Sequence, residues 1–294
     1  MKFYIVDVFA EQKYQGNQLA VLIPDRDIDA KEMQQIARET NFSETTFITS
    51  DRQKNGGYNV RIFTPGDEVP FAGHPTLGTA YIIYKNIEQE KNNKIILNLG
   101  VGEIPVTIKD GILTMEQKQP EFGLIAEDLK EIASILKINE GDIIENYPVQ
   151  VVSTGLPALI IPLKTYDALK RCAVNHDLYH QFLDKKCKCN LLAFFAEKPD
   201  NKTAPTSGNV RVRVFVDDPG FVEDPATGSA NGNLAGYFLK YNYLGSSKIS
   251  YNAHQGVEMN RPSLLQINAE LQNGIYTIKV GGKVFPIADG NWGR

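Results

Sequence analysis

Glu44 is the first candidate for acid–base chemistry in this chain. It lies in the segment 41–47 (NFSETTF), between the end of an expected helix and an apolar strand. Burial at such a junction would raise the pKa of a carboxylic acid toward neutrality, where a general acid or base works best. The alternative is an exposed glutamate at a helix-to-strand turn, and Glu44 taken alone favours that alternative. Other features of the chain must decide between the two.

Two segments rich in glycine and polar residues are candidates for binding an anion, 71–80 (FAGHPTLGTA) and 222–235 (VEDPATGSANGNLA). Each pattern predicts a turn that runs into a helix of small residues, and Pro75 suits the start of a helix, where its missing N–H costs nothing. The N–H groups and dipole of a helix start attract negative charge, so Gly73 and Gly228 could hold a carboxylate or stabilise a developing enolate. Singly, each segment fits a tight packing turn equally well.

The residue types of a Ser-His-Asp hydrolase are also present, in His74, Asp224 and Ser229. The chain around Ser229 does not match the G-x-S-x-G elbow, because Asn231 stands two residues after the serine. Of the adjacent acids Asp67-Glu68 and Glu223-Asp224, we expect only Asp224, which precedes Pro225, to be aimed at a site. We expect the other three to be solvated.

A zinc site is suggested by His176 and His180, spaced i, i+4, and by Cys187 and Cys189 further along. Cys-x-Cys is tighter than the usual structural zinc spacing, and the helix carrying the histidines should bury Leu178 and Phe182. We therefore expect no metal and ordinary thiols. Three cysteines, an odd number, also argue against a disulfide framework.

These candidates are set in a weak internal repeat. Both halves of the chain carry, in the same order, two strands separated by a glycine, a helix, a strand, an Arg-x-Phe strand and a Gly-led helix. The matched positions are Gly16 and Gly155, Arg61 and Arg213, and Gly73 and Gly228, and their separation grows steadily along the chain, as loop insertions would make it. The repeat makes the paired turns better candidates for anion binding than either turn alone.

The repeat is too long for a solenoid and predicts two similar domains, residues 1–118 and 119–278, with the tail 279–294 a candidate to pack onto the first. Asp29 should cap a helix that buries Met33, Ile36 and Ala37, and a second amphipathic helix should bury Leu129, Ile132, Ala133 and Leu136. The segment 276–288 predicts a hairpin that turns at Gly281-Gly282.

Composition narrows the functional class. The chain has 294 residues, 42% of them hydrophobic, and a net charge of −4 without a basic stripe, which argues against a nucleic-acid partner. Asp7 and Glu11 interrupt the N-terminal segment where a signal peptide would be apolar, and the longest apolar run, 158–163, is too short to span a membrane. We expect a soluble, cytoplasmic protein that does not bind membranes.

Together these segments make the sequence resemble the PhzF family, the phenazine biosynthesis-like proteins of the diaminopimelate epimerase-like fold. The resemblance covers nearly the whole chain and is carried by residues 9–23 (FAEQKYQGNQLAVLI), 41–47, 61–80, 221–230 (FVEDPATGSA) and 255–263 (QGVEMNRPS). It implies an α+β fold with two pseudo-symmetric domains, each a curled, mostly antiparallel sheet around a central helix, with the active site in the cleft between them. It also implies a homodimer.

The resemblance further implies an isomerase that needs no metal or organic cofactor. The residue matching Glu44 moves a proton within a small carboxylated, cyclic substrate, and the best-known family reaction isomerises trans-2,3-dihydro-3-hydroxyanthranilate. His74, Asp224 and Ser229 match residues that bind and orient the substrate, with Asn17, Gly73 and Gly228 as further binding positions.

Epimerases and racemases of the same fold carry a cysteine just before each of the two turns. Here those positions hold Ala72 and Thr227, which cannot act as bases at neutral pH, so a two-thiol racemase is excluded. Two alternatives to the isomerase remain, a family member that only binds a small molecule or a partner, and a hydrolase that uses Ser229. The presence of Glu44, His74, Asp224 and Ser229 favours an enzyme over the binding protein. The hydrolase predicts covalent labelling by a serine-directed reagent, which we do not expect.

Overall fold

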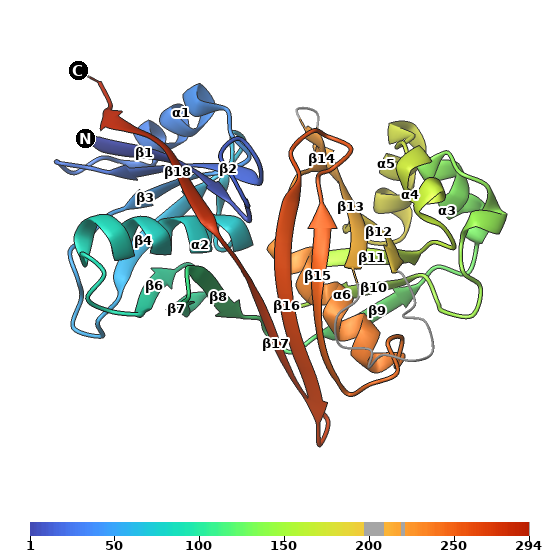
Figure 1. The fold of residues 1–294 in the computed structure, drawn as a ribbon. Coiled ribbons are helices and arrows are strands. Elements are labelled where there is room, and N and C mark those ends of the chain that lie inside the picture. Colours follow the sequence, from blue (N-terminus) through green and yellow to red (C-terminus); the bar gives the residue numbers. More distant parts are fainter. Residues whose placement is uncertain (197–208, 219–220, 294) are drawn as a thin grey trace. The chain divides into compact units, whose positions relative to one another are not determined.

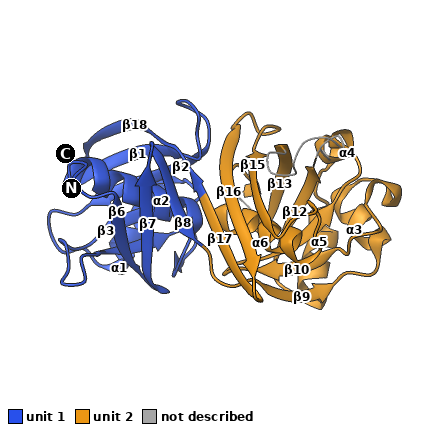
Figure 2. Cartoon of the chain, turned by 60° about the horizontal axis from the view of Figure 1, so that its bottom comes forward, with its two compact units in different colours: residues 1–116, 281–294 blue, residues 117–280 orange. Residues whose placement is uncertain are grey.

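The computed structural model describes residues 1–196, 209–218 and 221–293. The chain forms two compact units, which Figure 2 colours separately. Unit 1 comprises Met1–Glu116 together with Gly281–Arg294, and unit 2 comprises Gln117–Val280. No helix among the described residues is both long enough and apolar enough to span a membrane.

Unit 1 is a curled set of strands around one buried helix, α2 (Figure 1). Its elements are β1 (Lys2–Val8), β2 (Asn17–Ile23), α1 (Ala30–Thr40), β3 (Thr45–Ile48), β4 (Tyr58–Phe63), β5 (Glu68–Val69), α2 (Gly73–Ile82), a π-helical turn (Ile83–Ile87), β6 (Lys94–Leu99), β7 (Gly102–Lys109), β8 (Ile112–Glu116) and β18 (Val284–Asn291). Helix α2 is buried from Gly73 to Ala80 and contacts strands on several sides, including β1, β2, β3 and β6.

Unit 2 repeats this plan around helix α6. Its elements are β9 (Glu121–Ile125), α3 (Leu129–Leu136), a 3-10 turn (Glu140–Asp142), β10 (Gln150–Ser153), β11 (Pro157–Pro162), α4 (Tyr166–Arg171), α5 (His176–Lys185), β12 (Asn190–Ala196), β13 (Asn209–Asp218), β14 (Phe221–Asp224), α6 (Gly228–Lys240), β15 (Lys248–Gln255), β16 (Ser263–Gln272) and β17 (Ile275–Gly282). Helix α6 is buried from Gly228 to Leu239 and contacts β10, β11, β15 and β16.

Strand pairing shows the duplication directly. In unit 1, β1 pairs antiparallel with β2, β2 parallel with β3, β3 antiparallel with β4, β4 parallel with β6 and β6 antiparallel with β7. In unit 2, the same senses occur in the same order for β10 with β11, β11 with β12, β12 with β13, β13 with β15 and β15 with β16. The predicted α+β fold, with two similar sheets around central helices, is confirmed.

The outer helices form where their caps and apolar faces predict. The Asp29 side chain accepts a hydrogen bond from the Glu32 N–H (2.8 Å) at the start of α1, and Met33, Ile36 and Ala37 are buried. Helix α3 is capped in the same way by Asp128, and its buried residues are Ile132, Ala133, Ile135 and Leu136. Leu129, which the sequence predicted to be buried, is only partly buried, because it is the first residue of the helix. Local chemistry is enough to place both helices.

The predicted hairpin at Gly281-Gly282 is wrong. Both glycines belong to β17, and the following strand β18 pairs with β1. The turn that joins β16 to β17 is Asn273-Gly274, where both residues have left-handed backbones (φ 52° and 79°), as an Asn-Gly turn favours. Gly281 is needed for another reason, because a Cβ there would lie 2.7 Å from the Leu113 carbonyl oxygen of β8.

The expectation that Glu223 is solvated is also wrong. Its side chain is only 10% exposed and accepts two hydrogen bonds from the Arg213 guanidinium, at 2.9 and 2.6 Å. Arg213 lies on β13 and Glu223 on the neighbouring strand β14, so strand pairing brings the two charges together. A carboxylate with so little exposure needs such a partner to offset its lost hydration.

Candidate active site

Glu44 is the last residue before β3, in a short connection fixed at both ends. Helix α1 ends at Asn41, whose backbone is left-handed (φ 53°), and the hydroxyls of Thr40 and Thr45 are hydrogen-bonded across the connection at 2.7 Å. The Glu44 side chain is 17% exposed. It is therefore not the solvated turn residue of the alternative interpretation.

His74 is the second residue of α2, and its ring lies against Glu44. The His74 Nε2 and Glu44 Oε2 atoms are 3.4 Å apart, and both are buried. A hydrogen bond between the hydroxyls of Thr46 and Thr79 (2.8 Å) ties β3 to α2 beside this contact. The structure thus brings two of the predicted catalytic residues together within unit 1.

Asn17 joins the same group of residues. It is buried at the start of β2, and its side-chain nitrogen donates a hydrogen bond to His74 Nδ1 (3.2 Å). The resemblance implies a substrate contact for Asn17, whereas its amide here contacts the histidine. Asn17 therefore orients the ring of His74 toward Glu44.

The His74 imidazole is neutral at pH 7. Burial lowers its pKa from 6.5 to about 3, and a hydrogen bond with the backbone of Gln18 offsets only part of that effect. The contact with Glu44 is consequently not an ion pair near neutrality. A neutral imidazole offers one donor and one acceptor nitrogen, so His74 can hydrogen-bond its surroundings without adding a positive charge beside Glu44.

The start of α2 has the properties expected of an anion site. Its N-cap residue, Ala72, has an extended backbone and no side chain able to accept from the helix. N–H groups in the first turn of a helix have no acceptor within that helix. The backbone N–H groups of Gly73 and His74, the first two residues of α2, are therefore candidate donors to an anion.

In unit 2, Asp224 ends β14 and Ser229 lies in the first turn of α6. Ser229 is 3% exposed, and Gly228 is the first residue of the helix. The Thr227 hydroxyl donates a hydrogen bond to Asp224 Oδ2. The predicted residues of this half thus gather at one helix start, as those of the first half do.

Sequence reasoning missed Gln255 as a site residue. Its side chain is fully buried and hydrogen-bonds the Asp224 carbonyl oxygen at 2.7 Å. The sequence feature that could have identified it is its place as the first residue of 255–263, one of the segments that carry the family resemblance. The next residue, Gly256, has a left-handed backbone (φ 71°), and a Cβ there would lie 2.6 Å from the Pro225 carbonyl oxygen. Only a glycine therefore allows the chain after β15 to pack this closely on the residue that follows Asp224.

Cys172, Cys189 and His180 have surroundings of their own. Cys172 and Cys189 are buried among apolar side chains of α3, α5 and β11, and burial raises the pKa of Cys172 to about 12. His180 is exposed and hydrogen-bonds Asp217 (2.9 Å). Within the described part of the chain, no group of His, Cys, Asp and Glu side chains is arranged to hold a metal ion.

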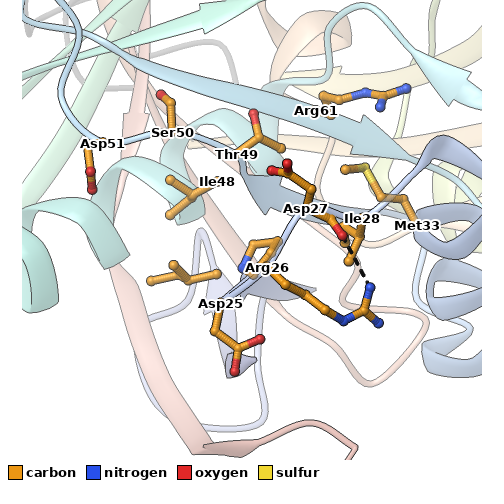
Figure 3. Close-up of a pocket in the computed structure, with 12 residues that line it drawn as sticks. Asp25, Arg26, Asp27, Ile28, Met33, Ile48, Thr49, Ser50, Asp51 and Arg61 are labelled. Atoms are coloured by element: carbon orange, nitrogen blue, oxygen red, sulfur yellow. Dashed lines mark hydrogen bonds between the residues drawn. The ribbon is translucent and has the colours of Figure 1, made fainter.

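A separate pocket of about 570 Å³ in unit 1 is lined by the segment after β2 and by the end of β3 (Figure 3). Its two arginines are already paired: Arg26 binds Glu32 (3.0 Å), and Arg61 binds Glu68 (2.7 and 2.6 Å). Glu44, His74 and Asn17 are not among its lining residues. We assign no function to this pocket.

Solved structures define the class of the fold. A PhzF-family phenazine biosynthesis protein of Bacillus anthracis is similar with a TM-score of 0.87, at 22% identity, over 99% of this chain and 98% of that one. A hydroxyproline epimerase of Agrobacterium vitis is similar with a TM-score of 0.63, at 10% identity, over 99% of this chain and 91% of that one. The fold is therefore that of the diaminopimelate epimerase-like proteins.

Sequence comparison gives the family. Residues 6–290 match the family described as phenazine biosynthesis-like protein. An uncharacterized isomerase of Pasteurella multocida is 32% identical, over 98% of this chain and 92% of its own length. The trans-2,3-dihydro-3-hydroxyanthranilate isomerase of Pseudomonas chlororaphis is 32% identical, over 91% of this chain and 90% of its own length. The chain belongs to the phenazine biosynthesis-like (PhzF) family and is an isomerase.

Proposed function

We propose that this isomerase shifts a double bond in a small carboxylated, cyclic substrate by acid–base proton transfer, with Glu44 as the proton carrier and with no metal or organic cofactor. The observation that carries the proposal is the 3.4 Å contact between Glu44 Oε2 and Nε2 of the neutral His74. The carboxylate removes a proton from one carbon and the electron pair moves through the double bond. Protonated Glu44, whose proton exchanges with solvent, then protonates a second carbon. Glu44 ends the cycle as a carboxylate.

A neutral histidine suits this role. A protonated imidazole beside Glu44 would stabilise the carboxylate and oppose its protonation during the cycle. The buried, neutral ring of His74 lies 3.4 Å from the Glu44 carboxylate without adding that charge. The backbone N–H groups at the start of α2 could stabilise the negative charge that develops on the substrate.

We further propose that Asp224, Ser229 and the start of α6 bind the same substrate. This part of the proposal rests on the sequence repeat, which matches the start of α6 to the start of α2. Because relatives in Pseudomonas are named for trans-2,3-dihydro-3-hydroxyanthranilate, that compound is the first substrate to test.

The experiment follows deuterium incorporation into this compound by NMR in D₂O, with wild type, Glu44→Gln and Glu39→Gln. Glu39 is an exposed acid on α1, five residues from Glu44, and serves as the matched control. We expect Glu44→Gln to lower turnover by about 10²–10⁴-fold, the usual contribution of a general acid or base. Glu39→Gln should leave turnover unchanged.

Two outcomes would contradict the proposal. Equal turnover by wild type and Glu44→Gln would remove Glu44 from the chemistry. Saturable binding of the compound to wild type, with neither isomerisation nor deuterium incorporation at stoichiometric enzyme, would favour a binding protein over a catalyst of this reaction.

A further inference from the structure

Gln255 is the centre of a buried hydrogen-bond cluster at the start of α6. Its Nε2 donates to the Asp224 carbonyl oxygen (2.7 Å) and to Thr227 Oγ1 (2.9 Å). Its Oε1 accepts from the Thr227 N–H (3.2 Å) and from Asn231 Nδ2 (2.9 Å). Both amide protons and both lone pairs are therefore used, which fixes the orientation of the side chain.

Thr227 connects this cluster to the Asp224 carboxylate. Its oxygen accepts from Gln255, and its single hydroxyl proton is donated to Asp224 Oδ2. The three groups form a chain from amide to hydroxyl to carboxylate, and each hydrogen bond in such a chain polarises the next. Asp224 is thus held at two points, its backbone carbonyl oxygen and its side-chain Oδ2.

The Thr227 hydroxyl holds the Asp224 carboxylate and does not cap α6. Thr227 is the N-cap of α6, a position where a threonine hydroxyl normally accepts from the helix and stabilises it by about 1 kcal/mol. Its side chain makes no such cap hydrogen bond. Helices α1, α3, α4 and α5 are all capped by their N-cap side chains, so α6 forgoes an interaction that those helices make.

We infer that Gln255 and Thr227 are positioning residues for Asp224 in the isomerase reaction. The inference rests on the proposed function, in which Asp224 binds the substrate. Thr227 acts on the reaction only through Asp224, and Gln255 acts through Thr227 and the Asp224 carbonyl group. Neither side chain needs to touch the substrate.

A double-mutant cycle tests the inference with trans-2,3-dihydro-3-hydroxyanthranilate as substrate. Thr227→Val removes the hydroxyl, and we expect it to lower kcat/KM by about 10–100-fold, as the loss of a hydrogen bond to a charged group does. Thr227→Ser keeps the hydroxyl and should stay within about threefold of wild type. In an Asp224→Asn background, Thr227→Val should add little, because the carboxylate that it positions is already absent.

Thr154→Val is the matched control. Thr154 is also buried in unit 2, and its hydroxyl donates to Asn233 Oδ1 on α6 (2.8 Å), away from the helix start. We expect it to lower thermal stability about as much as Thr227→Val and to leave kcat/KM unchanged. Thr227→Ala is measured alongside, so that the conclusion does not depend on the folding of one variant.

The inference is overturned if the effects of Thr227→Val and Asp224→Asn multiply, since the hydroxyl would then act independently of the carboxylate. It is also overturned if Thr154→Val lowers kcat/KM equally, because the effect would then be one of packing. Failure of the proposed function gives a different result, namely wild-type turnover by Glu44→Gln, and this result does not depend on the double-mutant cycle.

Discussion

Arg213 and Glu223 form a two-point ion pair that repeats, inside unit 2, the pair made by Arg61 and Glu68 in unit 1. Each arginine donates through Nε and Nη2 to both carboxylate oxygens of its glutamate. The side chains of the unit 2 pair are 9% and 10% exposed, against 33% and 42% in unit 1. The duplication has thus kept the geometry of the pair and changed its environment.

The two pairs should respond differently to removal of one charge. We expect Glu223→Gln to lower the free energy of unfolding by roughly 3 kcal/mol, because it leaves the buried Arg213 charge without its counter-ion. Glu68→Gln should cost less than about 1 kcal/mol, since water can solvate Arg61. Urea unfolding of both variants measures the difference. Equal losses in the free energy of unfolding would contradict the stronger dependence of Arg213 on its counter-ion.

Burial of neutral His74 should make stability depend on pH. Its pKa is lowered to about 3 in the folded chain, against 6.5 for an unperturbed histidine, so the unfolded state takes up a proton first as the pH falls. The stabilisation is complete above pH 6.5 and is lost progressively between 6.5 and 3. From pH 7.5 to 5 the loss is about 2 kcal/mol.

Comparison of wild type with His74→Gln isolates this contribution. We expect the free energy of unfolding in urea to fall between pH 7.5 and pH 5 by about 2 kcal/mol more in wild type than in the variant. Nitrogen-15 NMR of the ring gives an independent measurement and should find neutral His74 at pH 5. A ring that titrates near 6.5 would refute the buried neutral state.

Gly281 should tolerate no side chain, although its backbone is not left-handed. A Cβ there would lie 2.5 Å from Thr114 Oγ1 and 2.7 Å from the Leu113 carbonyl oxygen. We expect Gly281→Ala to lower stability by about 1–3 kcal/mol, as overpacking does. Gly141→Ala is the control, because a Cβ at Gly141 meets nothing within 4 Å. Thermal unfolding that does not distinguish the two variants would argue against close packing of Gly281 on β8.

Ser229 should not react as an activated nucleophile. The neighbouring Asp224 carboxylate accepts from the Thr227 hydroxyl, and the ring of His74 lies against Asn17 and Glu44. We expect no covalent adduct after incubation with a fluorophosphonate, as read by mass spectrometry of the intact chain and of its peptides. An adduct that forms on Ser229 in the folded chain, but not in a chain denatured by heat before the incubation, would support the hydrolase hypothesis.

Features set by local chemistry were predictable from the sequence. Asp29 and the spacing of Met33, Ile36 and Ala37 placed α1, because caps and helical periodicity involve neighbours in the chain. The repeated Gly-led segments placed the starts of α2 and α6. Local patterns failed at Gly281-Gly282, because a glycine pair does not distinguish a turn from a strand that packs closely on another backbone.

The sequence alone thus determined the duplicated α+β fold, the family and the choice of Glu44, His74, Asp224 and Ser229 as candidates. Only the tertiary structure decided that Asn17 orients His74, that Glu223 is paired with the buried Arg213, and that Gln255 holds the Asp224 turn. The reason is physical. Burial, a shifted pKa and a side-chain hydrogen bond all depend on which distant strands pair and pack, and the residues next to each other in the chain do not specify that arrangement.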